Sequence, residues 1–156
     1  MPIDPVIRDS VPKDRDAFIQ LWEACLTMHD VATDSSAAGI VWNLAHGSGS
    51  GFGLRVASVG SGGIGGFALH SWQANTWSGG TDGCLDTLFV AQGLRGAGLG
   101  RALVDDLLAL GCERGWRSVF WHVRADNVAA RALYDRYGVA DGYRRYRVPL
   151  AASAPP

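Results

Sequence analysis

The sequence predicts a mixed α+β fold, in which helices cover both faces of one β-sheet. Apolar residues recur at helical spacing in residues 14–25 and 99–114, and short runs of β-branched and aromatic residues, such as SVFWHV, indicate strands. The expected order is β-α-α-β-β-β-α-β-α-β, without an internal repeat. A chain of 156 residues suits one domain, which we expect at residues 1–150, followed by a disordered tail at 151–156.

The individual elements follow from hydrophobic period and from glycine-rich turns. The first half is expected to form a strand at 6–8, helices at 14–25 and 35–44, and a hairpin of strands 54–59 and 67–72 around a turn at 60–66. The second half is expected to form strands at 84–90, 118–123 and 143–150 and helices at 99–114 and 127–137. The buried stripe of the longest helix is expected to be Leu99, Leu103, Leu107 and Leu110.

Composition indicates a globular protein that neither spans a membrane nor binds nucleic acid. Hydrophobic residues make up 47% of the chain, and no apolar run approaches the length of about 20 residues that a membrane span needs. Asp4, Arg8 and Asp9 interrupt the region where a signal peptide needs an apolar core, so we expect a cytoplasmic protein. The net charge of −1 argues against nucleic acid, which is bound through clustered positive charge.

The cysteines and the distribution of charge give two further expectations. Cys25, Cys84 and Cys112 are far apart and lack metal-ligand spacing, so we expect reduced, mostly buried thiols, no disulfide and no metal site. Residues 1–80 carry seven acidic and four basic residues, whereas residues 81–156 carry eight acidic and ten basic residues. The second half therefore suits an anionic ligand, and the first half suits a cationic one.

The most informative local pattern is the glycine-rich turn RGAGLG at residues 95–100, between an expected strand and an expected helix. Three glycines allow a ligand to approach the backbone, and the start of a helix suits a pyrophosphate. Arg95 and Arg101 add positive charge. The turn is neither a Walker loop nor a G-x-G-x-x-G motif, since Arg101 occupies the last glycine position. Taken alone, it is also compatible with a purely structural turn.

Two motifs together resemble the GNAT superfamily of acetyltransferases. VAQGLRGAGLG at 90–100 is similar to its acetyl-CoA signature R/Q-x-x-G-x-G/A, with Arg95, Gly98 and Gly100 at the matching positions. NVAARALY at 127–134 is similar to the family's N-x-x-A-x-x-L-Y motif. The likeness covers residues 65–150 and is greatest to the polyamine and histone acetyltransferase branch, while the first 60 residues match only in outline. It implies a GNAT fold, with a mostly antiparallel, splayed sheet of six to seven strands.

The resemblance also implies that acetyl-CoA is the co-substrate. Its pantetheine arm would lie along the main chain of Leu88, Phe89 and Val90, and the Val90 amide would stabilise the oxyanion. Residues at the loop and the helix start would bind the pyrophosphate, namely Arg95, Gly96, Ala97, Gly98, Leu99, Gly100 and Arg101. Asn127 would contact the pantetheine, and its alternative role is a helix N-cap.

Two further residues are candidates for catalysis. Tyr134 matches the motif tyrosine that protonates the departing thiolate, and its alternative role is core packing beside Leu133. Asp86 matches a position at which polyamine acetyltransferases carry a glutamate that helps to deprotonate the amine, and strand alternation would place it on the face of Leu88 and Val90. The chain departs from that pattern, because Asp is shorter than Glu and the next residue is Thr87. A catalytic, a substrate-binding and a structural role of Asp86 therefore stay open.

Other polar and aromatic residues carry weaker expectations. His122 has no evident carboxylate partner and is interpreted as a structural sheet histidine. The loop after the first helix supplies His29, Asp30 and Asp34 as amine contacts or as solvent-facing residues. The tryptophans are candidates for an aromatic wall or for core and interface, namely Trp22, Trp42, Trp72 and Trp77.

These observations predict an N-acetyltransferase that moves an acetyl group directly from acetyl-CoA, in a ternary complex, to a primary amine of a small cationic molecule or of a lysine-like side chain. The alternative is an acetyl-CoA-binding module of the same fold without turnover, against which Tyr134 and Asp86 argue. An NAD-binding fold is disfavoured, because the strand after the glycines lacks an acidic residue. Tyr143, Tyr146 and Trp77 are expected to be exposed and favour a homodimer, and the sequence does not identify the acceptor.

Overall fold

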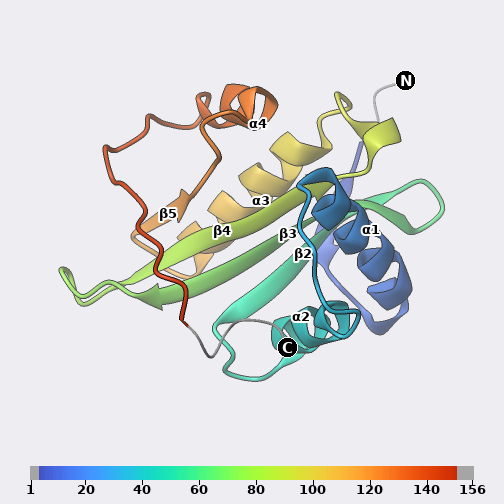
Figure 1. Cartoon of the computed structure of the whole chain (residues 1–156), viewed down its shortest axis with the longest axis horizontal. Coiled ribbons are helices and arrows are strands. Elements are labelled where there is room, and N and C mark those ends of the chain that lie inside the picture. Colours follow the sequence, from blue (N-terminus) through green and yellow to red (C-terminus); the bar gives the residue numbers. More distant parts are fainter. Residues whose placement is uncertain (1–3, 151–156) are drawn as a thin grey trace. The chain divides into compact units, whose positions relative to one another are not determined.

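The structure, a computed structural model, describes residues 4–150. The chain divides into two compact units, Met1–His122 and Val123–Pro156. The first unit contains the β-sheet and helices α1, α2 and α3, and the second contains helix α4 (Val128–Tyr134) (Figure 1). The tail expected at residues 151–156 lies outside the described residues. Among the described helices, none is both long and apolar enough to cross a membrane.

The sheet of the first unit is mixed and has five strands in the order β1-β2-β3-β4-β5. Neighbouring strands from β1 to β4 are antiparallel, whereas β4 and β5 run parallel. The strands are β1 (Val6–Asp9), β2 (Phe52–Val59), β3 (Gly63–Ala74), β4 (Thr81–Val90) and β5 (Ser118–Trp121). For the described residues, the expected sheet of six to seven mostly antiparallel strands is therefore corrected to a five-stranded mixed sheet.

The strand expected at residues 143–150 does not form. These residues are exposed and have no regular secondary structure. Arg145 and Arg147 would place two charges on one face of a strand here, and Arg144 would interrupt the other face. Pro149 in addition lacks the amide hydrogen that a strand ladder requires.

Strand β3 begins at Gly63, inside the segment that its glycine content predicts as a turn. A Cβ at Gly65 would lie 2.4 Å from Cδ1 of Leu94, and one at Gly66 would lie 2.8 Å from the carbonyl oxygen of Phe89. These glycines therefore allow β4 and the loop that follows it to pack closely on β3. Only residues 60–62 form the turn itself.

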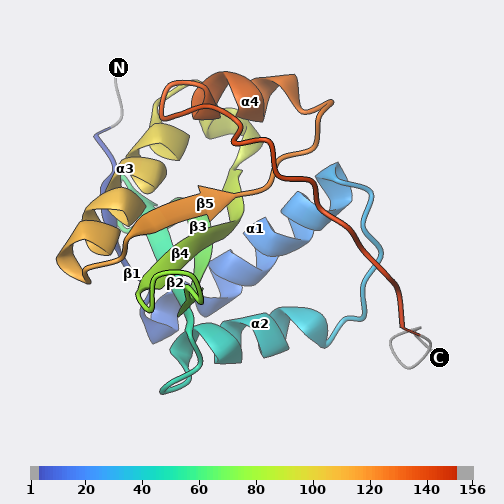
Figure 2. The same ribbon diagram turned by 90° about the vertical axis from the view of Figure 1, so that its left-hand side faces the viewer.

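Helices cover both faces of the sheet, as the sequence predicts (Figure 2). Helices α1 (Arg15–Met28) and α2 (Ala37–His46) pack on one face, and α3 (Leu99–Glu113) packs on the other. Short 3₁₀ turns precede α1 and α3, namely η1 (Pro12–Asp14) and η2 (Gln92–Leu94). Helix α1 extends beyond its expected end at Cys25, and α4 stops before its expected end at residue 137.

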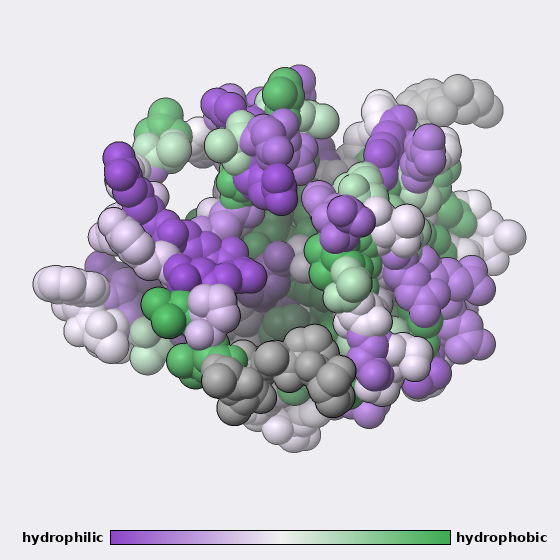
Figure 3. Space-filling view, viewed as in Figure 1, coloured by the Kyte–Doolittle hydropathy of each residue, from purple (hydrophilic) through white to green (hydrophobic). Residues whose placement is uncertain are grey.

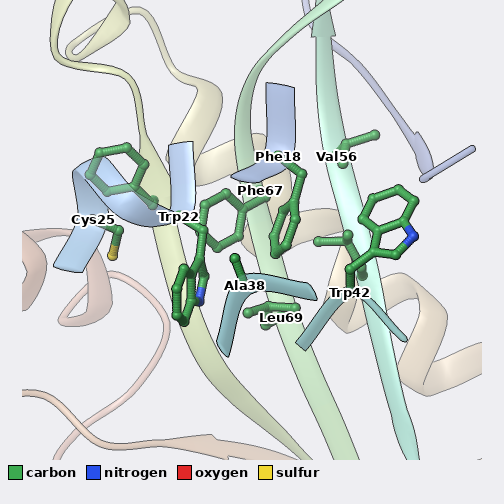
Figure 4. Packing of buried hydrophobic residues seen from close by; sticks show 10 residues of the cluster. Phe18, Trp22, Cys25, Ala38, Trp42, Val56, Phe67 and Leu69 are labelled. Carbon is green, nitrogen blue, oxygen red and sulfur yellow. The ribbon is translucent and has the colours of Figure 1, made fainter. Parts of the chain in front are cut away.

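An aromatic cluster between the sheet and helices α1 and α2 forms the main core (Figure 4). The Phe18 ring packs edge to face with Phe67 at 5.1 Å and tilted against Trp42 at 5.7 Å, both measured between ring centroids. Trp22 and Cys25 extend this cluster along α1. The outward side of α1 is mostly hydrophilic (Figure 3), so the amphipathic pattern of the helix determines which side faces the sheet.

On the opposite face, α3 buries the leucine stripe that the sequence predicts. Leu99, Leu103 and Leu107 are fully buried, whereas Leu110 is only half-buried. Arg55 of β2 donates to both carboxylate oxygens of Asp106 on α3, at 2.7 and 2.8 Å. This bidentate ion pair fixes α3 against the sheet in addition to the leucine packing.

His70 of β3 is a buried polar residue on the α3 face of the sheet. It is 2% exposed, and neither ring nitrogen has a hydrogen-bond partner among the described residues. Its ring lies 6.0 Å from Trp72 and 6.1 Å from Trp116, measured between centroids. Burial, followed by the charges of Arg114 and Arg55, lowers the pKa of His70 to about 4.

We predict that His70 makes the fold sensitive to mild acid. Its folded pKa of about 4 lies below the ordinary value of about 6.5, so the unfolded chain binds a proton that the folded chain does not. The contribution of His70 to the free energy of unfolding should be constant above about pH 6.5. It should decrease by about 3 kcal/mol as the pH falls to about 4. Urea unfolding of the wild type and of His70→Leu across this range measures the effect.

The control for this prediction is His29→Leu, because His29 is an exposed histidine. The pH dependence between about 4 and 6.5 should largely disappear in His70→Leu and persist in His29→Leu. The same slope in all three proteins would contradict the account of His70.

Candidate active site

The loop between β4 and α3 adopts backbone conformations that favour glycine. Gly96 has a φ of +79°, and Gly98, the N-cap residue of α3, has a φ of +90°. A Cβ built at either position would have no atom within 4 Å. Glycine is therefore required here by backbone conformation, and the space beside these two residues is open to a ligand.

The start of α3 provides main-chain donors next to these glycines. Helix α3 begins with Leu99 and Gly100, and the first residues of any α-helix have no carbonyl one turn earlier to accept from their amides. With the positive end of the helix dipole, such amides suit phosphate oxygens. The loop and the helix start thus fit the pyrophosphate of acetyl-CoA.

The two arginines of this region are held by neighbouring groups. Arg95 donates to the carbonyl oxygen of Val90 at 3.2 Å, and its Nη2 lies 3.0 Å from Sδ of Met28 at the end of α1. Figure 1 shows the end of α1 beside this loop. Arg101 lies 3.6 Å from Asp105, one helical turn further on. Both positive charges are present where the sequence predicts them, but Arg95 is directed toward β4 and α1.

The last residues of β4 present main-chain groups at a free edge of the strand. The parallel pairing with β5 ends at the pair Leu85 and Trp121, whereas β4 continues to Val90 beside β3. The amide of Ala91 donates to Gly65 on β3 at 2.9 Å, so the amide of Val90, one residue earlier, points to the opposite edge.

The same alternation directs the Leu88 amide to this edge as well, because it lies two residues before Val90. The Phe89 side chain is buried in the core cluster, and its amide, two residues before that of Ala91, faces β3, so Leu88 and Val90 carry the main-chain donors of this edge. The geometry fits the expected binding of an extended arm along this strand, with the Val90 amide as an oxyanion donor.

Asp86 occupies an irregular position in β4. In the register with β3, Leu69 pairs with Thr87 and His70 pairs with Leu85. Asp86 is therefore the additional residue of a β-bulge, without a partner of its own in the ladder. A bulge interrupts the alternation of side chains between the two faces of a strand.

The expectation that Asp86 shares a face with Leu88 and Val90 is wrong for this reason. Asp86 interacts with the side chains of Ser71 and Cys84, which pair with each other across β3 and β4. Asp86 therefore lies on the face of Cys84. Simple alternation would also place Val90 on that face, but the bulge between them shifts Val90 to the other face.

The environment of Asp86 includes a neighbour that the sequence analysis missed. The residue is exposed overall, yet partial burial of its carboxyl group raises the pKa of Asp86. The Ser71 and Cys84 side chains and the charge of His122 act in the opposite direction. His122, interpreted as structural from the sequence, therefore has a carboxylate nearby. The parallel pairing of its strand with β4 is the signal that identifies this neighbour.

The motif residues Asn127 and Tyr134 belong to the second unit. Oδ1 of Asn127 accepts from the Ala130 amide at 3.1 Å, so Asn127 is the N-cap of α4. Tyr134 is the last residue of α4 and is half-buried, and burial raises its pKa. The structural role of Asn127 is confirmed, whereas its contact with pantetheine stays a prediction.

The remaining candidates lie in different surroundings. His29, Asp30 and Asp34 are exposed after α1, and Asp34 accepts from the Ser36 amide at 2.7 Å, which is a local turn contact. Trp22 and Trp42 belong to the core, and Trp72 stacks with Trp116. Trp77 is 97% exposed, so the four candidate tryptophans do not line one binding surface. Cys25 is buried, Cys84 half-buried and Cys112 exposed, which differs from the expected mostly buried set.

Comparison with known proteins gives a family match and several solved structures. The acetyltransferase (GNAT) family model matches residues 16–139. A ribosomal-protein-alanine N-acetyltransferase from Brucella melitensis biovar Abortus 2308 is 20% identical, with 93% of this chain and 99% of that chain covered and a TM-score of 0.77. A Trypanosoma brucei acetyltransferase is 22% identical, with 94% and 100% covered and a TM-score of 0.72.

A further structure is an aminoglycoside acetyltransferase from an uncultured soil metagenomic sample, in complex with sisomicin. It is 16% identical, with 94% of this chain and 96% of that chain covered and a TM-score of 0.77. At these identities, the likeness to solved structures establishes the fold. No curated protein matches the chain significantly.

We predict that Gly98→Val weakens acetyl-CoA binding by more than about tenfold, equivalent to about 1.4 kcal/mol or more. A branched side chain disfavours the φ of +90° at this position and would occupy the open space beside the helix start. Calorimetry with acetyl-CoA measures the affinity, and circular dichroism verifies that the variant is folded.

The matched control is Gly62→Val, because Gly62 has a similar φ of +105° and equally open surroundings on the β2–β3 turn. It imposes a comparable backbone strain at a distance from the loop in sequence and should leave the affinity for acetyl-CoA unchanged. Unchanged affinity in a folded Gly98→Val protein would contradict the prediction that this loop binds acetyl-CoA.

Proposed function

Because the chain belongs to the GNAT acetyltransferase family, we propose that it transfers the acetyl group of acetyl-CoA directly to a primary amine of a small cationic molecule or of a lysine-like side chain. The observation that supports this most strongly is the free edge of β4, which leads into a glycine N-cap at the start of α3. Such an arrangement offers donors to an extended arm and to a pyrophosphate in one continuous path.

Acetyl-CoA supplies an activated acyl group as a thioester, and the protein holds it for attack. In this proposal, the amides of Leu88 and Val90 orient the arm, and the amides at the start of α3 hold the pyrophosphate. The Val90 amide also stabilises the negative charge that develops on the carbonyl oxygen during attack. The main chain therefore does most of the binding, which explains why the side chains of this segment can be apolar.

Tyr134 is proposed as the acid that protonates the leaving thiolate. Burial raises the pKa of this phenol, which keeps it protonated at neutral pH. An ordinary phenol of pKa about 10 gives its proton to a thiolate of pKa about 8.5 only slightly uphill. A hydrogen bond formed in the transition state is sufficient to assist departure of the thiolate.

The acceptor is proposed to be cationic because Asp86 is exposed beside the end of the β4–β5 pairing. The acidic excess of residues 1–80 acts in the same direction. Among the structural neighbours, one is named for alanine of a ribosomal protein and another holds the aminoglycoside sisomicin. These names motivate testing both peptide amines and polycationic small molecules.

Three finer expectations remain part of the proposal. The polyamine or histone branch is suggested by the sequence likeness over residues 65–150 and is tested by the choice of acceptor. A homodimer and a cytoplasmic location stay predictions; Tyr143, Tyr146 and Trp77 are exposed, as a dimer contact requires of each single chain. The alternative of a binding module without turnover is not favoured, since the family is one of acetyltransferases.

The test of the proposed function is the release of coenzyme A thiol from acetyl-CoA with a panel of amines, followed by mass spectrometry of the products. The panel contains polyamines, aminoglycosides, free amino acids and peptides with a lysine or a free N-terminus. A mass increase by one acetyl group on a cationic amine supports the proposal. Binding of acetyl-CoA without acetylation of any amine would leave only the binding module.

We predict that Tyr134→Phe lowers kcat by at least about tenfold while the affinity for acetyl-CoA changes little. The substitution keeps the ring and removes the hydroxyl, so the loss of a transition-state interaction should appear in kcat. Tyr137→Phe is the matched control, because it removes a nearby phenol hydroxyl of the same unit and should leave kcat unchanged. Equal kcat in wild type and Tyr134→Phe would return Tyr134 to a packing role.

A further inference from the structure

Two ionisable residues stand next to each other where β4 and β5 separate. The parallel register runs from the pair Asp82 and Ser118 to the pair Leu85 and Trp121. The next residues along the two strands are Asp86 and His122. Each directly follows the last pair of the register, so the two residues start from neighbouring backbone positions.

Their side chains lie on the same face of the sheet. The rings of Phe120 and His122 are 5.9 Å apart between centroids and nearly perpendicular, so they share one side of β5. Phe120 pairs with Cys84, and Cys84 is one of the two residues that interact with the Asp86 carboxyl group. We call Ser71, Cys84, Asp86 and His122 the fork cluster, because it lies where the two strands diverge.

This face continues the one that carries the aromatic core, but helices do not bury the two ionisable residues. Helix α1 packs on β3 and β4, and α2 packs on β2. Asp86 and His122 are both exposed, so a substrate can reach them from solvent. The charge of one acts on the other, since His122 lowers the pKa of Asp86 against the effect of burial.

We propose that His122 accepts the proton of the incoming amine and that Asp86 is its positioning residue. The inference rests on the proposed function and assigns the step that the sequence left open. Val90 lies four residues beyond Asp86 on β4, a distance that an intervening water molecule helps to bridge. The carboxylate attracts the ammonium form of the acceptor and stabilises the imidazolium that forms.

The protons of this step balance between the site and the solvent. The ammonium loses one proton to an unprotonated ring nitrogen of His122, and the lone pair of the resulting amine forms the bond to the acyl carbon. The bond from that carbon to sulfur breaks, and the thiolate takes a proton from the acid assigned to Tyr134. The nitrogen then loses its second proton to water, water reprotonates the phenolate of Tyr134, and His122 releases the first proton to water, so the products are a neutral amide and a free thiol.

Imidazole suits this task better than a carboxylate does. An ammonium group of pKa about 10 is almost fully protonated at neutral pH, and an imidazole of ordinary pKa about 6.5 is a stronger base than a carboxylate of about 3.9. Histidine is therefore the usual base at neutral pH, with an acidic neighbour that orients it. In this division, Asp86 binds charge and His122 moves the proton.

Asp86 is the main charged neighbour of His122. Asp86 and Cys84 face it from β4, and Ser71 on β3 carries no charge. Arg124 follows two residues later in the chain, and its guanidinium is paired with Asp126 at 3.0 Å. Asp86 is therefore the charged group whose removal should most affect the function of His122.

The main test is the pH dependence of kcat/KM with the best acceptor amine, for the wild type and for His122→Gln, His122→Ala, Asp86→Asn and His46→Gln. We expect His122→Gln to lose at least about tenfold in kcat/KM and to have a less steep acid limb than the wild type. Added imidazole should restore part of the rate of His122→Ala, which a packing defect would not allow.

The two other variants separate the roles. Asp86→Asn should raise KM for cationic amines more than it lowers kcat, because it removes charge but leaves the imidazole. His46→Gln should leave the profile unchanged, since His46 is the last residue of α2 and its Nδ1 lies 2.7 Å from the Trp42 carbonyl oxygen in the same helix. An unchanged rate and acid limb in His122→Gln, with an active wild type, would overturn the assignment of His122 alone. A wild type that acetylates no amine would overturn this assignment together with the proposed function.

A second measurement tests the cluster without turnover. Carbon-13 NMR follows the titration of the Asp86 carboxyl group, whose pKa His122 lowers. The pKa of Asp86 should rise in His122→Gln and stay constant in His46→Gln. A constant value in both variants would contradict the coupling on which the proposal depends.

Discussion

The unequal pairing of β4 with its two neighbours is the constraint on which the site depends. β4 pairs with β3 up to Val90, but its pairing with β5 ends at Leu85 and Trp121. Main-chain amides near the end of β4 consequently point to an edge that no strand of the described sheet covers. Because a main-chain amide needs a hydrogen-bond partner, such an edge favours a ligand that can act like an additional strand.

The rest of the first unit holds this edge in position. Phe89 fixes the strand from one face through the aromatic core, and Arg55 with Asp106 fixes α3 against the other face. Gly65 and Gly66 have no side chains, so the end of β4 and the loop that follows β4 can pack closely on β3. The start of α3 therefore stands directly after the free edge, and both parts of one extended ligand can be bound by main chain.

The sequence predicts those parts of the fold that depend on local pattern. Periodic apolar residues identify α1 and α3 because the helical stripe of each is continuous. RGAGLG identifies the loop before α3, in which Gly96 and Gly98 have positive φ. The sequence mispredicts Gly63 to Gly66 as a turn, because close packing between strands requires glycine as much as a turn does. The strand expected at the end of the chain does not form, and that segment carries three arginines and a proline among its apolar residues.

Local sequence pattern cannot predict which face Asp86 occupies or that it neighbours His122, because both depend on how the strands pair. A bulge depends on how two strands align, and one inserted residue reverses every assignment that simple alternation makes. The nearness of Asp86 and His122 depends on a parallel pairing between strands that are far apart in the chain. The proposed acyl-donor residues come from motif resemblance, whereas the proposed acceptor residues depend on the sheet register.

Amide hydrogen exchange followed by NMR, with and without acetyl-CoA, tests the central claim most directly. If the free edge of β4 and the start of α3 bind acetyl-CoA, the amides of Leu88, Val90, Leu99 and Gly100 should exchange more slowly in its presence. The amides of the β2–β3 turn, such as that of Gly62, should exchange at an unchanged rate. Saturating acetyl-CoA that leaves the exchange of Val90 and Gly100 unaltered would contradict this account of the site.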